Sequence, residues 1–297
     1  MKNLIKKKKR EKALRWGIRG GAHSATAPCV ATCLFLGCGN MGSAIAESLL
    51  CLKKPLFKSL QILDPHPEKC TSLKKMGAKI IPSLKAVKIE ADTVTMIAVK
   101  PQDVDPLLKQ LRPHLHPQSL LISIAAGVTL KRLQKNSGHF RVVRVMPNTP
   151  ALIQKGASAW IASSSVTAAQ KKAVQRMLES FGIAIEVRRE QDMDAVTALS
   201  GSGPAYVFYF LEALVQGAMK LGLSSDPAQK LAIQTLIGGS ELALRQAKTL
   251  DDLIALRAKV TSKGGTTERA IAVFEKKQFK KIVGEALKAA FDRAQEL

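Results

Sequence analysis

Residues 33–52 read CLFLGCGNMGSAIAESLLCL, and this stretch decides the fold of the first half of the chain. An apolar run that predicts a strand leads into GCGNMG at residues 37–42, and a helical pattern follows. The glycines have the spacing G-x-G-x-x-G between a strand and a helix. Gly37 allows the tight turn, Gly39 lets a pyrophosphate approach the backbone, and Gly42 lets the helix pack closely on the sheet. The pattern predicts a dinucleotide site at a helix N-terminus, and the alternative is a glycine-rich turn that binds nothing.

The composition limits the classes of protein to consider. The chain has 297 residues, 46% of them hydrophobic, which is enough for one large domain or two ordinary ones. Its net charge is +23, and residues 1–22 contain nine basic residues and one Glu. Such a charge attracts nucleic acid, membranes and phosphorylated cofactors alike. Because aromatic residues make up only 4%, we expect no nucleic-acid partner that binds by stacking.

The first 30 residues are predicted to form a basic, disordered tail. The apolar run at 29–38 imitates a signal peptide, but it is also the first strand, and cleavage there would destroy the glycine loop. No stretch is long enough to span a membrane, so we expect no membrane partner. All five cysteines lie within the first 70 residues without a C-x-x-C pair. They predict reduced thiols in a cytoplasmic protein and no metal site.

A second strand is predicted at Leu60–Leu63, and it ends at Asp64. An acidic residue at this distance from the glycines often accepts a hydrogen bond from a ribose 2′-hydroxyl and favours NAD. His66 and Lys69 follow it, and they could meet a 2′-phosphate instead. The sequence therefore leaves open whether the cofactor is NADPH or NADH.

Three further strands are predicted at residues 93–99, 120–124 and 142–145, and each stops at a loop containing Pro or Gly. The loops are VKPQ at 99–102, AAG at 125–127 and MPNTP at 146–150; we call them the carboxyl-end loops. In an open parallel sheet, ligands bind at the carboxyl ends of the strands. The carboxyl-end loops are therefore predicted to border the nicotinamide, although each one could be a plain turn.

From residue 191 the strand signals give way to long helical patterns, so we place a domain boundary near residue 190. The fold class is α/β: a Rossmann-type dinucleotide-binding domain at 31–190 is followed by an all-α domain at 191–297. Helices are predicted at residues 204–221, 227–246, 250–259, 268–275 and 279–295.

Two stretches of the second half do not resemble ordinary helix material. They are SGSGPAY at 200–206 and VTSKGGTTE at 260–268. The second places hydroxyls and glycines just ahead of a helix, which is an arrangement that binds carboxylates. A capped helix start is the alternative. No histidine lies beyond residue 139, so a site in the second half would not use histidine as acid or base. A reductase that acts on an imine needs least from the protein, because the iminium ion is itself the electrophile.

Six motifs in this order resemble the pyrroline-5-carboxylate reductase family. The resemblance covers the chain from about Ala31 to its end. The motifs are FLGCGNMG (35–42), AVKPQ (98–102), ISIAAGV (122–128), RVMPNTP (144–150), LSGSGPAY (199–206) and VTSKGGTT (260–267). The resemblance implies a helical dimerisation domain, with dimers often assembled into decamers. It also implies the reduction of 1-pyrroline-5-carboxylate to L-proline with NADPH or NADH.

The resemblance also implies which residues form the site. Thr267 would help to protonate the ring nitrogen, and Asn148 would lie near the nicotinamide. The cofactor would be held by Gly37, Cys38, Gly39, Asn40, Met41, Gly42, Asp64, Ala98, Val99, Lys100 and Pro101. The substrate carboxylate would be bound by Val260, Ser262, Gly265, Thr266 and Thr267, and no metal is implied.

Two positions depart from the family pattern. Lys263 stands where the family usually has proline, which puts the substrate affinity in doubt. Asp64 would repel a 2′-phosphate, which favours NADH. Three other hypotheses remain open at this point: a related two-domain reductase acting on a hydroxy acid or another cyclic imine, a cofactor-binding protein without turnover, and a nucleic-acid-binding protein.

Overall fold

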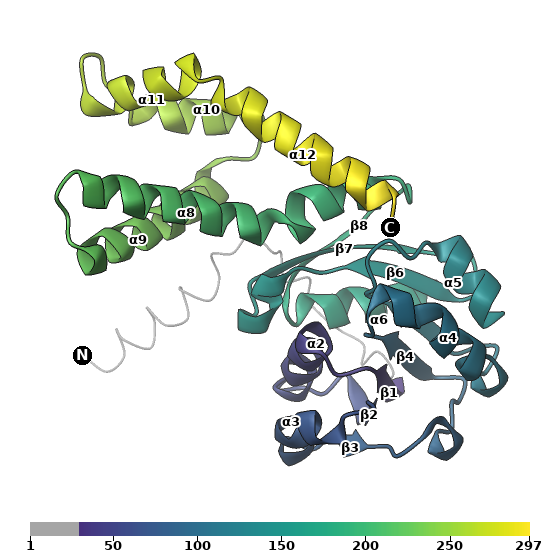
Figure 1. Cartoon of the computed structure of the whole chain (residues 1–297). Coiled ribbons are helices and arrows are strands. Elements are labelled where there is room, and N and C mark those ends of the chain that lie inside the picture. The colour runs from purple at the N-terminus through teal and green to yellow at the C-terminus, as the bar shows by residue number, and fades with distance from the viewer. Residues whose placement is uncertain (1–29) are drawn as a thin grey trace, which may run out of the picture. The chain divides into compact units, whose positions relative to one another are not determined.

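The computed structural model of the chain describes residues 30–297, and its ribbon is drawn in Figure 1. The predicted basic tail therefore lies outside the described residues, except for residue 30. The first element is strand β1 (Val30–Leu36), and helix α2 (Asn40–Leu50) follows after three residues. The strand–glycine loop–helix unit predicted at residues 33–52 is confirmed.

The described residues form one eight-stranded sheet with the order β3-β2-β1-β4-β5-β6-β7-β8. Strands β1 to β6 pair in parallel, β7 pairs antiparallel with β6, and β8 pairs parallel with β7. The strands after β1 are β2 (Phe57–Leu63), β3 (Lys79–Ile80), β4 (Thr93–Ile97), β5 (Leu120–Ser123), β6 (Val142–Met146), β7 (Gly156–Ala162) and β8 (Gly182–Glu186). The strand order reverses beside β1, where a parallel sheet binds its ligands.

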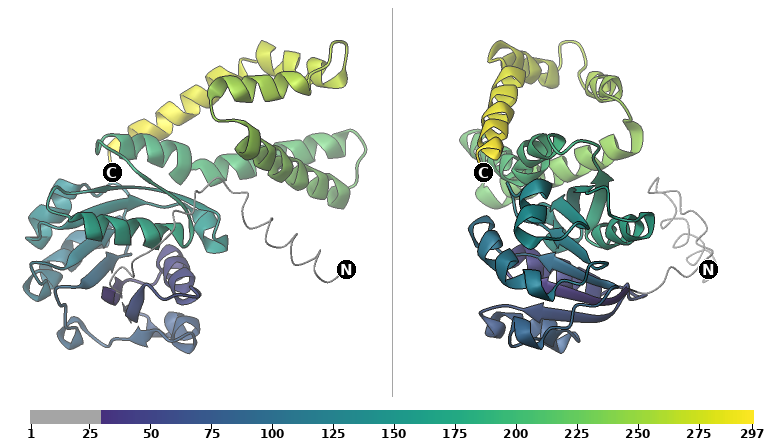
Figure 2. Two further views of the ribbon diagram at one scale, coloured as in Figure 1. Left: turned by 180° about the vertical axis from the view of Figure 1, so that it is seen from behind. Right: turned by 90° about the vertical axis from the view of Figure 1, so that its right-hand side faces the viewer.

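Helices cover both faces of the sheet (Figures 1 and 2). Alternating side chains of the strands build two apolar layers, one on each face. Cys33 and Phe35 of β1 face a core that includes side chains of α2, α3 (Thr71–Lys75) and α6 (Ala168–Glu179). Leu34 and Leu36 face a second core with side chains of α4 (Pro101–Leu111) and α5 (Leu130–Ser137). Strand β4 is buried along its whole length, as the continuous apolar run at 93–99 predicts.

The second half of the chain is helical, and every helix predicted there is present with ends within two residues of the prediction. These helices are α8 (Gly203–Lys220), α9 (Ser225–Gln246), α10 (Leu250–Lys259), α11 (Thr266–Lys276) and α12 (Phe279–Gln295). The sequence did not predict α7 (Asp192–Val196) or the π-helix (Thr197–Gly201) that connects α7 to α8. It also missed the short edge strand β3, because two residues give no measurable pattern.

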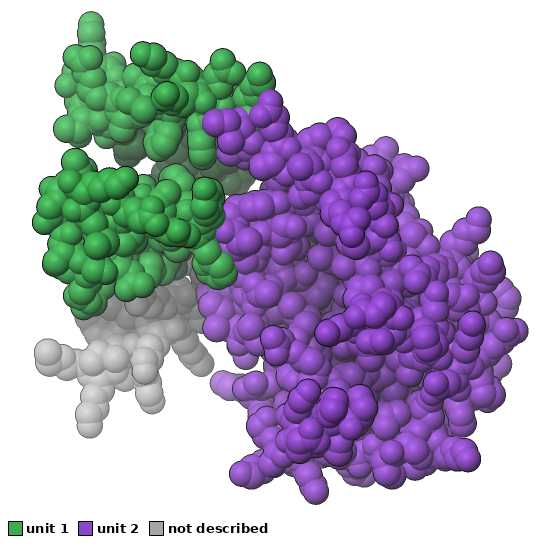
Figure 3. Space-filling model, in the orientation of Figure 1, with its two compact units in different colours: residues 1–27, 208–281 green, residues 28–207, 282–297 purple. Residues whose placement is uncertain are grey.

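Within the described residues the chain divides into two compact units, coloured in Figure 3. One unit contains residues 30–207 and 282–297, and we call it the sheet unit. The other contains residues 208–281, and we call it the helical unit. The division falls inside α8 and α12, so each of these helices contributes to both units.

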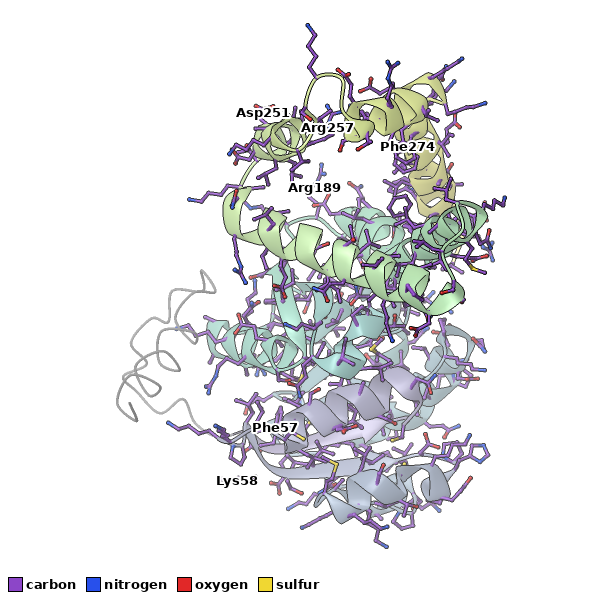
Figure 4. The ribbon with its side chains drawn as sticks, turned by 90° about the vertical axis from the view of Figure 1, so that its left-hand side faces the viewer. Phe57, Lys58, Arg189, Asp251, Arg257 and Phe274 are labelled. Carbon is purple, nitrogen blue, oxygen red and sulfur yellow. The ribbon has the colours of Figure 1, made fainter. Side chains whose placement is uncertain are left out.

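The helical unit has almost no core of its own. Ala228 is the one buried residue among residues 208–281. Local contacts join its helices: the Phe279 ring lies 5.3 Å from Phe274 and 6.3 Å from Phe210, and Arg257 is 3.4 Å from Glu275. Figure 4 labels Arg257 on α10 and Phe274 on α11. A chain segment that buries so little apolar surface cannot hold its fold alone.

Two searches of the described residues were negative. None of their helices is both long enough and apolar enough to cross a membrane. No group of three or more His, Cys, Asp or Glu side chains within residues 30–297 has the arrangement of a metal site.

Candidate functional site

The glycine loop between β1 and α2 has the geometry that the spacing predicts. Gly37 has φ +96°, a region that favours glycine, and a Cβ there would lie 2.7 Å from the carbonyl oxygen of Ala98. A Cβ on Gly42 would lie 2.9 Å from the carbonyl oxygen of Gly37 and 3.0 Å from the Cβ of Ala98. These two glycines therefore bring α2 and the end of β4 into close contact with the loop.

Gly39 differs from these two because no atom lies within 4 Å of the position that its Cβ would take. It is the N-cap residue of α2, and no side chain caps this helix. The first N–H groups of α2 thus remain available, and they carry the positive end of the helix dipole. Open space beside a bare backbone and an uncapped helix N-terminus fit the pyrophosphate of a dinucleotide.

Asp64 follows directly after β2, and both of its carboxylate oxygens accept backbone hydrogen bonds. The Cys38 N–H donates to Oδ2 at 2.5 Å, and the His66 N–H donates to Oδ1 at 2.8 Å. Asp64 therefore holds the glycine loop to the end of β2 and fixes its own orientation. The imidazole of His66 has a partner of its own, since its Nδ1 lies 3.3 Å from the carboxylate of Glu68.

A cleft of about 820 Å³ opens beside Asp64. Its wall includes Gly37, the carboxylate residue Asp64 and apolar residues from the segments after β3 and β4 and from α4. The apolar members include Ile81, Leu84, Val99 and Leu107, and Lys74 is also in the wall. An apolar wall with one oriented carboxylate suits the adenosine half of a dinucleotide.

The thiols near this cleft are packing groups. Burial, followed by the contact with Cys38, raises the pKa of the Cys70 thiol to about 12. Burial also raises the pKa of Cys33 far above its usual range. Both groups therefore stay protonated at neutral pH and are poor nucleophiles. The four described cysteines are free.

Residues Ala98 to Pro101 follow β4 and touch the glycine loop. The Ala98 N–H donates to the carbonyl of Leu36 at 2.8 Å, and Val99 lines the cleft. Lys100 is the N-cap residue of α4 and Pro101 is its first residue. The predicted cofactor residues at 37–42, 64 and 98–101 thus come together in the structure.

Asn148 in the loop after β6 is held on both sides of its amide group. Its Nδ2 donates to the carbonyl and the hydroxyl oxygens of Ser200, at 3.1 and 3.3 Å. Its Oδ1 accepts from the N–H of Ala157 at 2.8 Å. The following 3₁₀ helix (Thr149–Ile153) contacts α2. The MPNTP loop therefore lies beside both the glycine helix and the SGSGPAY stretch.

Ser200, the partner of Asn148, lies in the π-helix at Thr197–Gly201. A π-helix breaks the regular pattern of backbone bonds, and such breaks occur often at functional sites. Its packing is close, because a Cβ on Gly201 would lie 2.5 Å from Cε of Met146. The hydroxyl of Tyr206 in α8 donates to the carbonyl of Ala198 in the π-helix at 3.1 Å.

The predicted carboxylate site lies in the helical unit, in the loop ahead of α11. Gly264 has φ +75°, and its N–H donates to Oε2 of Glu268 at 2.8 Å. Gly265 is the N-cap residue of α11, and a Cβ there would lie 2.7 Å from Oγ of Ser262. No side chain caps α11, so its first N–H groups are available to an anion.

Two family profiles match this chain. A family profile described as pyrroline-5-carboxylate reductase dimerisation matches residues 190–297, and one described as NADP oxidoreductase coenzyme F420-dependent matches residues 32–127. The pyrroline-5-carboxylate reductase of Pseudomonas aeruginosa is 38% identical over 265 residues, which cover 89% of this chain and 95% of that protein. This chain belongs to the pyrroline-5-carboxylate reductase family.

Solved structures of the family agree. A pyrroline-5-carboxylate reductase from Coxiella burnetii has a TM-score of 0.82 and 33% identity, and the match covers 90% of this chain and 98% of that one. The Plasmodium falciparum pyrroline carboxylate reductase with NADP bound has a TM-score of 0.75 and 32% identity, covering 89% and 98%. As a family member this chain is an NAD(P)H-dependent oxidoreductase that acts on a CH–NH group. It uses a nicotinamide dinucleotide and a small-molecule substrate, and it forms oligomers.

Two features of this family member were not identified from the sequence. The first is the hydrogen bond between Asn148 and Ser200, because the two residues are 52 positions apart, although both lie in stretches that the sequence singled out. The second is Arg144. Arg144 lies inside β6 and is only 4% exposed. A charged residue in an otherwise apolar strand, VVRVM, was the one signal available for it.

Proposed function

We propose that the site described above reduces the C=N bond of 1-pyrroline-5-carboxylate to give L-proline, the last step of proline biosynthesis. The proposal rests on the glycine loop ahead of α2, a helix that has no side-chain cap. This loop occurs in a chain that matches pyrroline-5-carboxylate reductases along nearly their whole length.

Cofactor binding is assigned to the sheet unit. The N–H groups of residues 39–42 would bind the pyrophosphate, and Asp64 would accept from the adenosine ribose. Ala98 to Pro101 and Asn148 would border the nicotinamide. When bound, the reduced nicotinamide supplies the hydride for the C=N carbon.

Substrate binding is assigned to the loop ahead of α11. The N–H groups of Thr266 and Thr267, together with the Ser262 hydroxyl, would bind the substrate carboxylate, with Val260 and Gly265 shaping the loop. The Thr267 hydroxyl would donate to the ring nitrogen. This group favours the protonated, electrophilic form of the imine, so no histidine is required.

We further propose that the oligomer is a homodimer built through the helical unit, with a decamer as the larger assembly. The support is the dimerisation profile at 190–297 and the lack of a core in residues 208–281. The start of that profile also supports a domain boundary near residue 190. We propose a cytoplasmic location and no membrane or nucleic-acid partner for the enzyme.

The test is oxidation of NADPH and of NADH, measured separately, with 1-pyrroline-5-carboxylate as the acceptor. We expect turnover with at least one cofactor, and a Thr267→Val variant with kcat lowered about 10- to 100-fold. Ser224→Ala, at the start of α9, is a control that removes another exposed hydroxyl. No turnover by a protein that is folded and binds dinucleotide, together with activity on hydroxy acids, would reject the assignment.

A further inference from the structure

Arg144 is the most deeply buried charged residue near the proposed nicotinamide site. It lies in β6, four residues before Asn148, and its side chain is 5% exposed. Two carboxylates pair with its guanidinium: Nη1 is 3.3 Å from Oε1 of Glu190, and Nη2 is 3.4 Å from Oδ1 of Asp194. A buried cation is costly unless it is paired in this way.

Glu190 has a second partner. Its Oε1 also accepts from the N–H of Leu130 at 2.6 Å, and Leu130 is the first residue of α5. The AAG loop at 125–127 comes just before this helix. One carboxylate therefore connects Arg144 to the helix that follows a carboxyl-end loop. The contact is favourable because a helix N-terminus attracts negative charge.

Asp194 connects Arg144 to a third segment, which consists of α7 and the π-helix that follows it. It lies in α7, and α7 leads directly into the π-helix that contains Ser200. Asn148 bonds to Ser200, so β6 and its exit loop are linked twice to the same helical segment. The link between Arg144 and Asp194 is ionic and buried. The link between the Asn148 amide and the Ser200 carbonyl borders the proposed nicotinamide site.

We propose that Arg144, Glu190 and Asp194, which we call the Arg144 cluster, position two of the carboxyl-end loops, AAG and MPNTP, for hydride transfer. They fix Asn148 and Ser200 relative to one another, and they fix α5 behind the AAG loop. The three are positioning residues and touch no reacting atom. This inference rests on the proposed function, since it takes these loops to border the nicotinamide.

A role in positioning explains why the cluster is ionic. Apolar residues of similar volume often replace a buried ion pair without loss of stability. A fork-shaped guanidinium between two carboxylates instead fixes both distance and direction. A lysine could keep the charge but could not present two nitrogens to two carboxylates in this geometry.

The test uses the variants Arg144→Lys, Glu190→Gln and Asp194→Asn in the full chain. Lys171→Gln is the control, because Lys171 pairs with Glu186 at 2.6 Å between α6 and β8, which the Arg144 cluster does not join, in a more exposed setting. Three quantities are measured: kcat and KM for 1-pyrroline-5-carboxylate, the isotope effect on kcat with NADH deuterated at the transferred position, and the Kd values of NADH and ADP-ribose.

We expect kcat of the cluster variants to fall about 10- to 100-fold, because misplacing the reacting groups by about 1 Å costs that much. The isotope effect should rise as the hydride step becomes rate-limiting. The Kd of ADP-ribose should stay within about twofold, while NADH loses its extra affinity over ADP-ribose. The control should keep wild-type values.

Wild-type kcat and isotope effect in Asp194→Asn and Glu190→Gln would overturn the proposal. So would a lower melting temperature with unchanged kinetics per folded molecule, which is the result of a purely structural role. The comparison of NADH with ADP-ribose needs no turnover. It therefore tests the Arg144 cluster even if the wild-type protein fails to reduce 1-pyrroline-5-carboxylate, a failure that would reject only the proposed reaction.

Discussion

At the scale of single residues, the three glycines of the loop have separate tasks. Gly37 and Gly42 lack space for a side chain, whereas Gly39 faces open space. We therefore expect Gly37 and Gly42 to be required for the fold and Gly39 to be required for the ligand. The spacing alone could not separate these tasks, because all three residues look alike in the sequence.

A pair of substitutions tests this division. Gly37→Ala should lower the free energy of unfolding by about 1–3 kcal/mol, because an alanine at φ +96° is strained and its Cβ meets a backbone carbonyl. Gly39→Ala should leave stability within about 0.5 kcal/mol and raise the Kd of the cofactor at least about tenfold, since the methyl group takes up pyrophosphate space. Urea denaturation and fluorescence titration measure the two effects. Equal cofactor affinity in Gly39→Ala and wild type would contradict the role expected for Gly39.

Asp64 is expected to set the choice between the two cofactors. Its carboxylate is oriented by two backbone N–H groups and lines the cleft, so a 2′-phosphate would meet a fixed negative charge. Asp64→Asn should improve the affinity for 2′,5′-ADP relative to 5′-AMP by about tenfold. Glu47→Gln, which removes an exposed carboxylate of α2, is the control. An unchanged ratio of the two Kd values in Asp64→Asn would show that Asp64 serves only to hold the glycine loop.

At the scale of elements, the uncapped starts of α2 and α11 are both suited to anions. Both follow glycine-containing loops, and neither has a side-chain cap. By contrast, Thr249 caps α10 with its own hydroxyl, and Thr167 caps α6 in the same way. Helices α4 and α9 also lack a side-chain cap, so a missing cap leaves N–H groups available to an anion but does not by itself identify a binding helix.

Lys263 in the loop ahead of α11 should act through its charge. It is exposed and makes no hydrogen bond or ion pair within the part of the chain that the structure describes. Lys263→Met should raise the KM for the substrate about two- to fivefold at low salt, and the effect should disappear at high salt because exposed charges are screened. Lys263→Pro, which restores the usual family residue, should behave like Lys263→Met. Lys259→Met in the last turn of α10 is the matched control, and a KM change in that variant of equal size would assign the effect to general charge.

At the scale of the whole molecule, the helical unit exposes apolar side chains that a single chain leaves in water. Tyr209 is 75% exposed and Leu221 is 89% exposed, and only Ala228 is buried among residues 208–281. Exposed apolar surface of this kind marks an interface between protein chains. It agrees with the dimerisation profile that matches this region.

Breaking this interface should abolish activity. Leu231→Glu in α9 should shift the molecule from a dimer or larger assembly to a monomer, because a charge cannot be buried there without a partner. We expect kcat/KM to fall at least about 100-fold, since the helical unit carries the proposed substrate loop and cannot hold its fold alone. Light scattering gives the mass, and Phe140→Glu, an exposed apolar position of the sheet unit, is the control. A Leu231→Glu protein that is monomeric and fully active would refute this.

The sequence by itself determined the order of the elements, the glycine loop and the locations of the candidate site segments. These depend on local physics: alternation in strands, helical periodicity, and backbone conformations that only glycine tolerates. Tertiary structure alone decided how the segments meet. Asn148 with Ser200, and Arg144 with Glu190 and Asp194, are pairs 46 to 52 residues apart. Their bonds depend on strand order and on a π-helix, and neither leaves a periodic signal in the sequence. The missing core of the helical unit also became visible only when burial was known, because an apolar helix face looks the same whether its own chain or a second chain covers it.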